Sequence, residues 1–237
     1  MKDRKPTYTL RENYSGKNGW QYRLILGIIA LTMLLFSSCQ KWDNTEEVSH
    51  VSQLPNFEIT GGDFLSYIVA DSGEYTDQGA KAYSGETSLS VSSYGDVDLT
   101  TVGVYIIYYY AENSDGLSAI AERVVAVTNR DVTGNDLSGK YEGTLWSPLT
   151  ESKVTKVDEK GLYKCTEVLG YPGTEVKGRF VDLGNHVLVL LHGDGDFGAY
   201  ATTQGSYTLS TLSWTVSLQD DPYNGYDIDV VWSRKEK

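Results

Sequence analysis

Two acidic segments of the 237-residue chain carry residue types and spacings that could do chemistry. The first, His192 to Gly198, places a histidine and the carboxylates of Asp194 and Asp196 in a glycine-rich loop that could hold calcium or another metal ion. An EF-hand loop also needs further oxygen ligands and a distal glutamate at fixed spacing, and these are missing here. A turn with solvated acids is the favoured interpretation, and a metal site at Asp194 and Asp196 is the alternative prediction.

The second acidic segment is the pair Asp220-Asp221, which Pro222 follows. Paired carboxylates can serve as acid and base of a glycosidase when they are held roughly 5–10 Å apart. Adjacent residues on a turn usually point apart, and both Asp-Pro and the Asn-Gly that follows are ordinary turn chemistry. No serine-hydrolase elbow, phosphate loop or zinc spacing is present in the sequence. We therefore expect no catalytic residues, no enzymatic activity and no cofactor, with a glycan hydrolase as an alternative.

Aromatic side chains offer another kind of chemistry, because sugars stack their C–H faces on tryptophan and tyrosine rings. The chain has 18 tyrosines and 5 tryptophans. β-Domains use the same residues in cores and cross-strand pairs, and Trp214, in an alternating stretch, is expected to be such a core residue. Rings that loops carry are better candidates for exposed, ligand-binding positions. These candidates are Tyr171, Tyr200 and Tyr223, together with Trp146.

Cys39 lies at the end of a segment with the pattern of an export signal. The 13-residue apolar run from Leu24 to Phe36 follows Arg23 and precedes Ser37 and Ser38. A membrane-spanning helix needs about 20 such residues, so the run has the length of a signal-peptide hydrophobic region. The order small-small-cysteine resembles the lipobox of bacterial lipoproteins, in which the cysteine thiol receives a diacylglycerol and cleavage makes the cysteine the new N-terminus.

This resemblance implies that residues 1–38 are a lipoprotein signal peptide and that residues 39–53 are a lipidated acidic tether. Two or three acyl chains on Cys39 would hold the protein in a membrane, since each buried methylene contributes about 0.8 kcal/mol. Phe36 departs from the usual leucine of the lipobox. An uncleaved N-terminal anchor with an unmodified Cys39 is the alternative, and Met1 could precede the true start.

The residues after Cys39 resemble the short export signal that sends Bacteroidetes lipoproteins to the outer face of the outer membrane. We expect a lipid-anchored outer-membrane protein that faces the cell exterior, with a periplasm-facing anchor as the alternative. The residues of this predicted signal are Gln40, Lys41, Asp43, Glu46 and Glu47.

Charge and cysteine content limit the remaining possibilities. The formal net charge is −12, and the first 38 residues contain six of the 20 basic side chains but two of the 32 acidic ones. The acidic remainder lacks the basic stripe that binding to nucleic acid requires. With Cys39 lipidated, Cys165 has no partner for an intramolecular disulfide, and its alternating neighbours predict a packed small hydrophobe.

Short β-branched and aromatic runs separated by glycine, asparagine and aspartate predict an all-β chain. A segment rich in asparagine, aspartate, threonine and glycine near residues 128–136 predicts a boundary between two domains, over residues 54–130 and 131–237. These lengths suit two small β-domains.

The first domain resembles the bacterial immunoglobulin-like family of surface proteins, which also occurs in a pesticidal crystal protein. Tyr75 to Ala80 matches the family's Tyr-Thr-Asp-Pro-Gly-Ala turn, with Gln78 in place of proline. Asp98 to Ala111 matches its Asp-x-x-x-x-Gly-x-Tyr-x-x-x-Tyr-x-Ala strand pair, and Arg123 to Val127 its Arg-x-Val-x-Val closing strand. The resemblance implies a β-sandwich that acts as a spacer or binding unit without catalytic residues.

The second domain is expected to be a small antiparallel β-barrel or sandwich of unknown function. It opens with Leu137 to Gly143, as small antiparallel barrels often do, and resembles the C-terminal domain of uncharacterised Bacteroidetes lipoproteins. The strands expected here cover residues 140–146, 152–157, 161–168, 175–182, 185–191, 205–210, 212–218 and 226–233.

Together these features predict a non-enzymatic surface lipoprotein, an accessory glycan-binding protein of a polysaccharide uptake system. Its expected partners are the membrane, through Cys39, and a polysaccharide or components of an outer-membrane importer. A structural or adhesive spacer that binds a protein is the first alternative, and a glycan hydrolase is the second.

Overall fold

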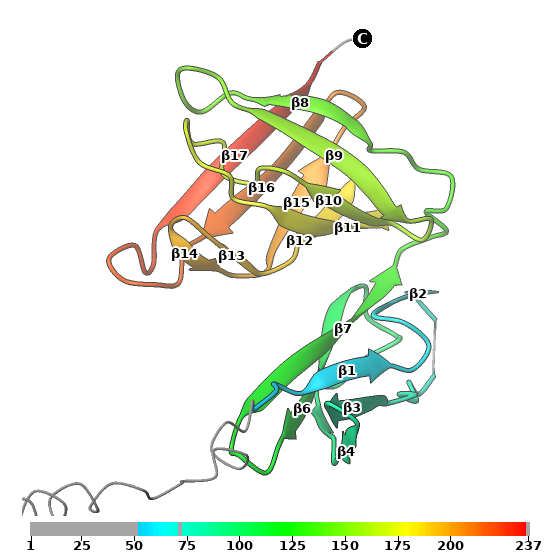
Figure 1. Ribbon diagram of the computed structural model, residues 1–237. Coiled ribbons are helices and arrows are strands. Elements are labelled where there is room, and N and C mark those ends of the chain that lie inside the picture. Colours follow the sequence, from blue (N-terminus) through cyan, green and yellow to red (C-terminus); the bar gives the residue numbers. More distant parts are fainter. Residues whose placement is uncertain (1–51, 71–72, 236–237) are drawn as a thin grey trace, which may run out of the picture. The chain divides into compact units, whose positions relative to one another are not determined.

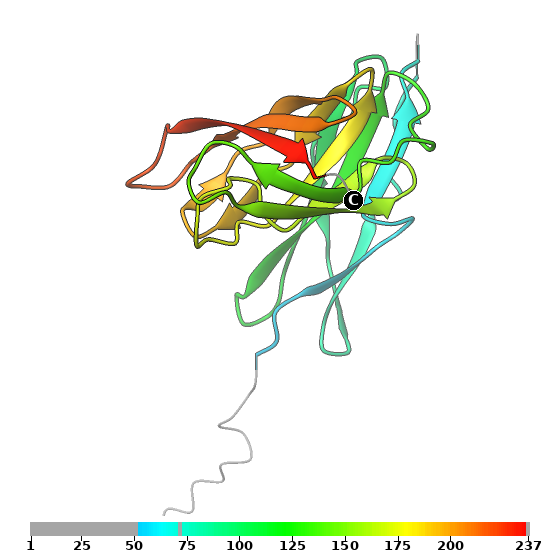
Figure 2. The same ribbon diagram turned by 90° about the horizontal axis from the view of Figure 1, so that it is seen from above.

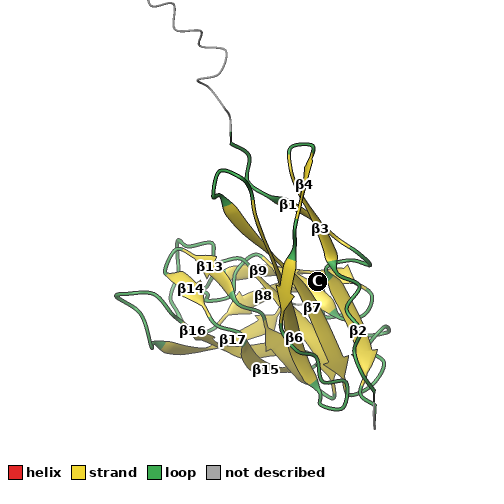
Figure 3. Ribbon diagram, turned by 90° about the horizontal axis from the view of Figure 1, so that it is seen from below, coloured by secondary structure: helices red, strands yellow, loops and turns green. Residues whose placement is uncertain are grey.

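The computed structural model describes residues 52–70 and 73–235. Over these residues the regular secondary structure consists of β-strands, and Figure 3 shows strands joined by loops. Within the described ranges there is no helix with the length and apolarity that crossing a membrane requires. The prediction of an all-β protein is confirmed.

The strands up to Thr128 form two sheets, in the orders β1-β3-β4 and β2-β7-β6-β5 (Figure 1). β2 runs parallel to β7, and the other neighbours are antiparallel. This is the two-sheet arrangement that the immunoglobulin-like resemblance implies. The strands are β1 (Asn56–Ile59), β2 (Phe64–Ile68), β3 (Ala80–Ser84), β4 (Thr87–Leu89), β5 (Ser92–Tyr94), β6 (Gly103–Glu112) and β7 (Ser118–Thr128).

β6 and β7 form a long hairpin at the centre of the second sheet. The turn between them is held by Asn113, whose side-chain oxygen accepts a hydrogen bond from the backbone N–H of Leu117 at 2.9 Å. Ile107 and Tyr109 alternate with less buried neighbours, as the pleat of a strand requires. β7 is buried on both faces from Arg123 onward, so other parts of the protein pack against it on each side of its sheet.

The strands after residue 138 close into an eight-stranded barrel in the order β10-β11-β12-β15-β16-β17-β8-β9. Each of the eight strands expected from the sequence overlaps one of them. Of the two forms predicted for this domain, barrel and sandwich, the structure shows the barrel. A short hairpin of two further strands, β13 (Gly193–Gly195) and β14 (Gly198–Tyr200), stands outside the barrel. The barrel strands are β8 (Gly139–Gly143), β9 (Glu151–Asp158), β10 (Leu162–Cys165), β11 (Gly178–Gly184), β12 (Val187–Leu190), β15 (Thr203–Tyr207), β16 (Thr211–Ser217) and β17 (Asp227–Arg234).

Large apolar side chains fill the barrel. Tyr163 stacks on Phe180 with ring centroids 5.1 Å apart, Phe180 lies 5.7 Å from Trp214, and Trp214 lies 6.3 Å from Trp232. Cys165 belongs to the same core and is buried, which confirms the expectation of a packed small hydrophobe. Trp214 is likewise a core residue, as predicted.

The barrel has two unlike ends because its strands run up and down in chain order. The connections of residues 144–150, 166–177, 191–202 and 218–226 all lie at one end, on the left of the barrel in Figure 1. The β16–β17 connection, orange to red, projects from this end in Figure 2. At the other end the connections are tight turns, at residues 159–161, 185–186 and 208–210.

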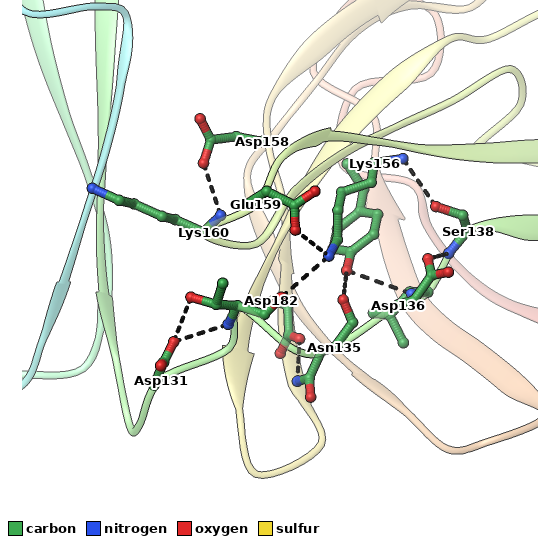
Figure 4. Close-up of polar contacts among 12 residues, drawn as sticks. Asp131, Asn135, Asp136, Ser138, Lys156, Asp158, Glu159, Lys160 and Asp182 are labelled. Carbon is green, nitrogen blue, oxygen red and sulfur yellow. Dashed lines mark hydrogen bonds and ion pairs between the residues drawn. The ribbon is translucent and has the colours of Figure 1, made fainter.

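The segment that leads into β8 closes the tight-turn end with polar contacts (Figure 4). The side-chain amide of Asn135 donates to Asp182 Oδ2 at 2.7 Å and to the Tyr207 hydroxyl at 3.2 Å. The backbone carbonyl oxygen of Asn135 accepts a hydrogen bond from the Tyr163 hydroxyl at 2.9 Å. Because Asp182 is fully buried, its carboxylate needs such partners, and the contacts fix the entry of the chain into the barrel.

The outer face of β11 is covered by the sandwich. Val181 and Leu183 of the barrel join Val124 and Ala126 of β7 in one buried apolar cluster. Nearby, the backbone N–H of Asn129 donates to the Leu183 carbonyl at 2.8 Å. This cluster explains why β7 is buried on both faces, and the described residues belong to a single compact unit.

Candidate functional site

Five aromatic side chains at the long-loop end of the barrel form a continuous series of edge-to-face contacts. Ring centroids are 5.1 Å apart for Trp146 and Tyr171, 5.6 Å for Tyr171 and Phe197, and 5.4 Å for Phe197 and Tyr223. Tyr226 extends the series, 6.4 Å from Tyr223. Such geometry is favourable because the electropositive edge of one ring meets the electronegative face of the next. We refer to these five residues as the aromatic chain.

The topology of the barrel brings the aromatic chain together. Trp146 lies in the β8–β9 connection, Tyr171 in the β10–β11 connection and Phe197 at the tip of the β13–β14 hairpin. Tyr223 and Tyr226 both lie in the β16–β17 connection. Because these connections share one end of an up-and-down barrel, residues far apart in sequence meet there.

Much of the aromatic chain is open to solvent. Tyr226 is 61 % exposed, Tyr171 41 % and Tyr223 40 %. Trp146 and Phe197 are half-buried and link the more exposed rings. Large side chains seldom gather at a surface in this way unless the surface binds something.

Glu167 holds the loop that carries Tyr171. Its buried carboxylate accepts hydrogen bonds from the backbone N–H groups of Leu169 at 2.9 Å, Gly170 at 3.0 Å and Val176 at 3.0 Å. Burial raises the pKa of Glu167, although these backbone donors act in the opposite direction. The loop is therefore fixed by an internal acceptor, and Tyr171 projects from an ordered segment.

Asp220 ties the other two loops together. Its Oδ2 accepts a hydrogen bond from the backbone N–H of Ala199 at 2.8 Å, and its carbonyl accepts one from the N–H of Tyr223 at 2.8 Å. Gly198 has φ of +85°, and a Cβ there would lie 2.5 Å from Asp220 Oδ2, so a glycine is required at this close approach. The contact sets Phe197 and Tyr223 beside each other.

The β8–β9 connection adds apolar surface beside Trp146. Leu145 and Leu149 are 46 % and 54 % exposed. The indole Nε1 of Trp146 is buried and has no hydrogen-bond partner among the described residues. The same is true of the Trp232 Nε1 in the barrel core, so this buried N–H does not itself mark a ligand position, and Trp146 contributes its ring to the surface.

Three of the four predicted ligand-binding aromatics, Trp146, Tyr171 and Tyr223, thus meet in the aromatic chain. The expectation that Tyr200 is an exposed loop residue is wrong, because its ring is 2 % exposed. Its hydroxyl donates to the Lys177 carbonyl at 2.8 Å, and a Cβ on Gly193 would lie 2.3 Å from that hydroxyl. The β13–β14 hairpin folds the Tyr200 ring into the barrel core.

Phe197 and Tyr226 belong to the site but are not among the residues that the sequence predicts for it. Phe197 lies in the glycine-rich loop that was considered for its carboxylates alone, although an aromatic ring at a loop tip was itself a signal. Tyr226 directly precedes β17, so its position in the sequence does not distinguish it from the many tyrosines of the strands. Their contribution depends on loop packing, which periodicity does not reveal.

The acidic candidates do not converge. In the described ranges no three side chains of histidine, cysteine, aspartate or glutamate are grouped so that they could hold a metal ion. Asp194 is exposed on β13, and Asp196 Oδ2 accepts a hydrogen bond from the backbone N–H of Glu175 at 3.4 Å. Asp221, next to Asp220, is exposed.

The residues of the predicted lipidation and export signals lie outside the described residues. These are Cys39, Gln40, Lys41, Asp43, Glu46 and Glu47.

The three motifs of the sandwich meet at a buried arginine. Arg123 is fully buried and forms an ion pair with Asp77, and its Nε donates to the Gly62 carbonyl at 3.1 Å. Asp77 also accepts hydrogen bonds from the hydroxyls of Tyr75 at 2.9 Å and Tyr109 at 2.8 Å. One residue or more from each motif takes part, so the motifs mark a structural network inside the sandwich.

Comparison with known proteins identifies the class of the first domain. Residues 59–127 match the family described as "Bacterial surface protein, Ig-like domain". The predicted resemblance to bacterial immunoglobulin-like surface domains is therefore confirmed for this segment. None of the curated proteins matches the chain.

One similar solved structure is the lipoprotein BT2262 from Bacteroides thetaiotaomicron. The two chains are 20 % identical, and the match covers 76 % of this chain and 100 % of the other with a TM-score of 0.32.

Proposed function

We propose that this protein is a non-enzymatic, lipid-anchored bacterial surface protein that binds glycan chains on its aromatic chain. The observation that carries the proposal is the meeting of five rings from four connections at one end of the barrel. Sugar rings stack their C–H faces on such side chains, and a row of rings suits a chain of sugars better than a single one. Glu167 and Asp220 hold the loops before any ligand arrives, which lowers the entropic cost of binding.

Binding to polysaccharides tests the proposal directly. The soluble chain 40–237 keeps the whole compact unit and lacks the cysteine of the predicted anchor. Affinity gel electrophoresis against a set of plant and bacterial polysaccharides should show retardation by at least one of them. Tyr171→Ala and Tyr223→Ala should each weaken it by about tenfold, as for central aromatic residues of other binding surfaces.

Tyr94→Ala is the matched control. Tyr94 is a 52 % exposed tyrosine of the sandwich that stacks on Tyr108, far from the barrel loops in sequence. The Tyr94→Ala variant should bind the polysaccharide as tightly as the parent chain does. Equal losses in all three variants, or no retardation by any polysaccharide, would count against the proposal.

The lipid anchor and its outward display form a separate part of the proposal, which rests on the sequence pattern around Cys39. Incorporation of labelled palmitate into the full-length chain, and its loss in Cys39→Ser, would support the anchor. Digestion of the protein by protease added to intact cells would support outward display. Protection until the outer membrane is opened would instead indicate a periplasm-facing anchor.

A protein partner is a second candidate function, which the exposed leucines beside Trp146 favour. Leu145→Ser with Leu149→Ser removes this apolar surface and leaves the exposed tyrosines in place. Loss of a co-purifying importer component with intact glycan binding would show that this loop contacts a protein.

A further inference from the structure

The basic side chains of the barrel lie on one part of its wall. Residues 139–179 contain seven lysines and arginines, whereas residues 180–233 contain none. In terms of strands, β8 to the start of β11 carry positive charge, and β12 to β16 carry none. The same residues include six acidic side chains, so their formal charge is +1 (seven minus six), against −12 for the whole chain. The acidic total predicts no basic stripe, but strand pairing places several of these cations side by side.

Strand pairing aligns four of these residues across adjacent strands. Lys140 of β8 is the register partner of Lys153 of β9, and Lys164 of β10 is the partner of Arg179 of β11. Their neighbours in sequence point into the core, so these four side chains point outward. Adjacent strands are about 4.8 Å apart. Because Lys164 pairs with Thr155, two residues from Lys153, the second pair is offset along the strands from the first, and the four charges form a slanted row. We call Lys140, Lys153, Lys164 and Arg179 the basic row.

Ion pairs set the basic row apart from neighbouring lysines of the barrel. Elsewhere on the barrel Lys156 pairs with Glu159, Lys177 with Glu175, and Lys235 with Glu142 and Glu151. In the part of the chain that the structure describes, no salt bridge involves a member of the basic row. Like charges placed directly opposite on paired strands are destabilising. At one end of the row Glu151, whose pKa is lowered by Lys235 and to a smaller extent by Lys140, offsets part of this cost.

The surface along the basic row is hollowed. One hollow of about 800 Å³ is lined by Lys140, Lys153 and Lys235, among others. A second, of about 600 Å³, is lined by Lys153, Lys164 and Arg179. Lys153 and Thr155 border both, so the two hollows adjoin and follow the row across four strands.

We propose that the basic row binds an acidic polysaccharide, a chain whose sugars carry carboxylate or sulfate groups. This inference rests on the proposed function and names the class of its ligand. The β8–β9 and β10–β11 connections, which carry Trp146 and Tyr171, join the same strands as the basic row. A chain stacked on those rings can therefore continue along the hollowed wall, where its anionic groups meet the four cations.

Charge and shape favour a polysaccharide over other anionic partners. The row spans half of an eight-stranded barrel, so it curves, and a flexible polymer follows a curved wall better than a flat bilayer does. Acidic side chains elsewhere on the molecule do not prevent binding, because salt screens charges beyond about 8 Å at physiological ionic strength.

Matched pairs of polymers test the inference. Polygalacturonate and its fully methyl-esterified form share a backbone, as do dextran sulfate and dextran, and each pair differs in charge. The soluble chain 40–237 should bind at least one charged member at least tenfold more tightly than its neutral partner. That binding should weaken as salt rises from about 50 to about 200 mM, since it releases counterions from the polymer.

Variants assign the effect to the row. Lys164→Gln with Arg179→Gln should lower affinity for the charged polymer by at least tenfold and leave the neutral polymer unaffected. Lys81→Gln, an exposed lysine on β3, is the matched control and should change neither. Because these side chains lie at the surface and the substitutions remove a like-charge pair, the variants should unfold at a temperature no lower than that of the parent chain.

The outcomes separate this inference from the proposed function. Equal affinity for the charged and neutral members of both pairs, with Tyr171→Ala still harmful, would overturn the acidic ligand and leave glycan binding in place. Charge-dependent binding that Tyr171→Ala and Tyr223→Ala do not weaken would support the basic row and overturn the role of the aromatic chain. Tighter binding to phosphatidylglycerol vesicles than to either charged polymer would overturn the polysaccharide in favour of a membrane surface.

Discussion

Arg123 and Asp77 form an ion pair inside the sandwich, with the arginine side chain fully buried. The guanidinium also donates to backbone carbonyl groups, among them that of Gly62. Tyr109 donates to Asp77 and lies under the guanidinium, with Arg123 Cζ 5.6 Å from its ring centroid. A buried charge is tolerated when its partners are complete, and here both the charge and the carbonyl groups around it are satisfied.

Removal of either partner should destabilise the protein strongly. Arg123→Met leaves Asp77 without its counter-ion and several carbonyl groups without a donor, and Asp77→Asn leaves a buried cation unpaired. We expect each to lower the free energy of unfolding by about 3–5 kcal/mol, measured by urea denaturation. Glu86→Gln, in the exposed β3–β4 turn, is the control and should cost less than about 0.5 kcal/mol. If Arg123→Met and Asp77→Asn lowered the free energy of unfolding as little as Glu86→Gln does, the network would contribute little to stability.

The same network should make stability depend on acid. Burial acts to raise the pKa of Asp77, but hydrogen bonds from Tyr109, Tyr75 and the Gly79 N–H, together with Arg123, hold it below its usual 3.8. A lowered pKa in the folded state contributes stability above pH 3.8 that is lost as the pH falls through the folded value. Between about pH 6 and about pH 2.5 the parent chain should therefore lose more stability than Asp77→Asn. Parallel losses in the two chains would contradict this assignment.

Cys165 should be chemically inert in the folded protein. Burial raises the pKa of its thiol to about 12, so the reactive thiolate is almost absent near neutral pH. Ellman's reagent at about pH 8 should find no thiol in the native soluble chain 40–237 and one per chain after unfolding in urea. Rapid reaction of the native chain would mean that the barrel opens at β10.

Glu167→Ala should loosen the loop that carries Tyr171. The substitution leaves the N–H groups of Leu169, Gly170 and Val176 without their acceptor, and an unsatisfied buried donor costs about 1–3 kcal/mol. Hydrogen exchange at these amides should accelerate well before the barrel strands exchange. Glu175→Ala, exposed in the same loop, is the control. Unchanged exchange in Glu167→Ala would show that the loop is held in another way.

The sequence predicted the elements better than it predicted their contacts. All eight barrel strands were anticipated because alternating patterns and turn residues are local signals, and the sandwich was anticipated from motifs that build one buried network. Trp146, Tyr171 and Tyr223 were selected because loops carry them. That they touch depends on the order of strands around the barrel, which no local pattern encodes.

Tyr200 shows where local reasoning fails. It follows a glycine-rich loop and looks exposed by position, but the β13–β14 hairpin pairs Gly193 with Tyr200 and directs its ring into the core. Gly178 and Gly193 leave the space that the ring occupies, since a Cβ on either would lie within 3 Å of its hydroxyl. The two glycines indicate that the Tyr200 ring is buried, but this can be recognised only when the strand register that brings them beside Tyr200 is known. The basic row depends in the same way on which strands are neighbours.

The apolar cluster between β7 and β11 should make the sandwich and the barrel unfold together. If the sandwich unfolded alone, Val181 and Leu183 of the barrel would be exposed, and if the barrel unfolded alone, Val124 and Ala126 of the sandwich would be exposed. Such exposure costs about 25 cal/mol per Å² of apolar surface.

Tryptophan fluorescence can test this coupling, because the described tryptophans, Trp146, Trp214 and Trp232, all lie in the barrel. With Trp42 replaced by phenylalanine, the fluorescence of the soluble chain reports on the barrel alone. Arg123→Met, a substitution within the sandwich, should then move the fluorescence transition to lower urea together with the circular dichroism transition. Leu183→Ala, which removes part of the cluster at a cost of about 2–5 kcal/mol, should separate the two transitions in the Arg123→Met background. A fluorescence transition that Arg123→Met leaves in place would show that the barrel is stable without the sandwich.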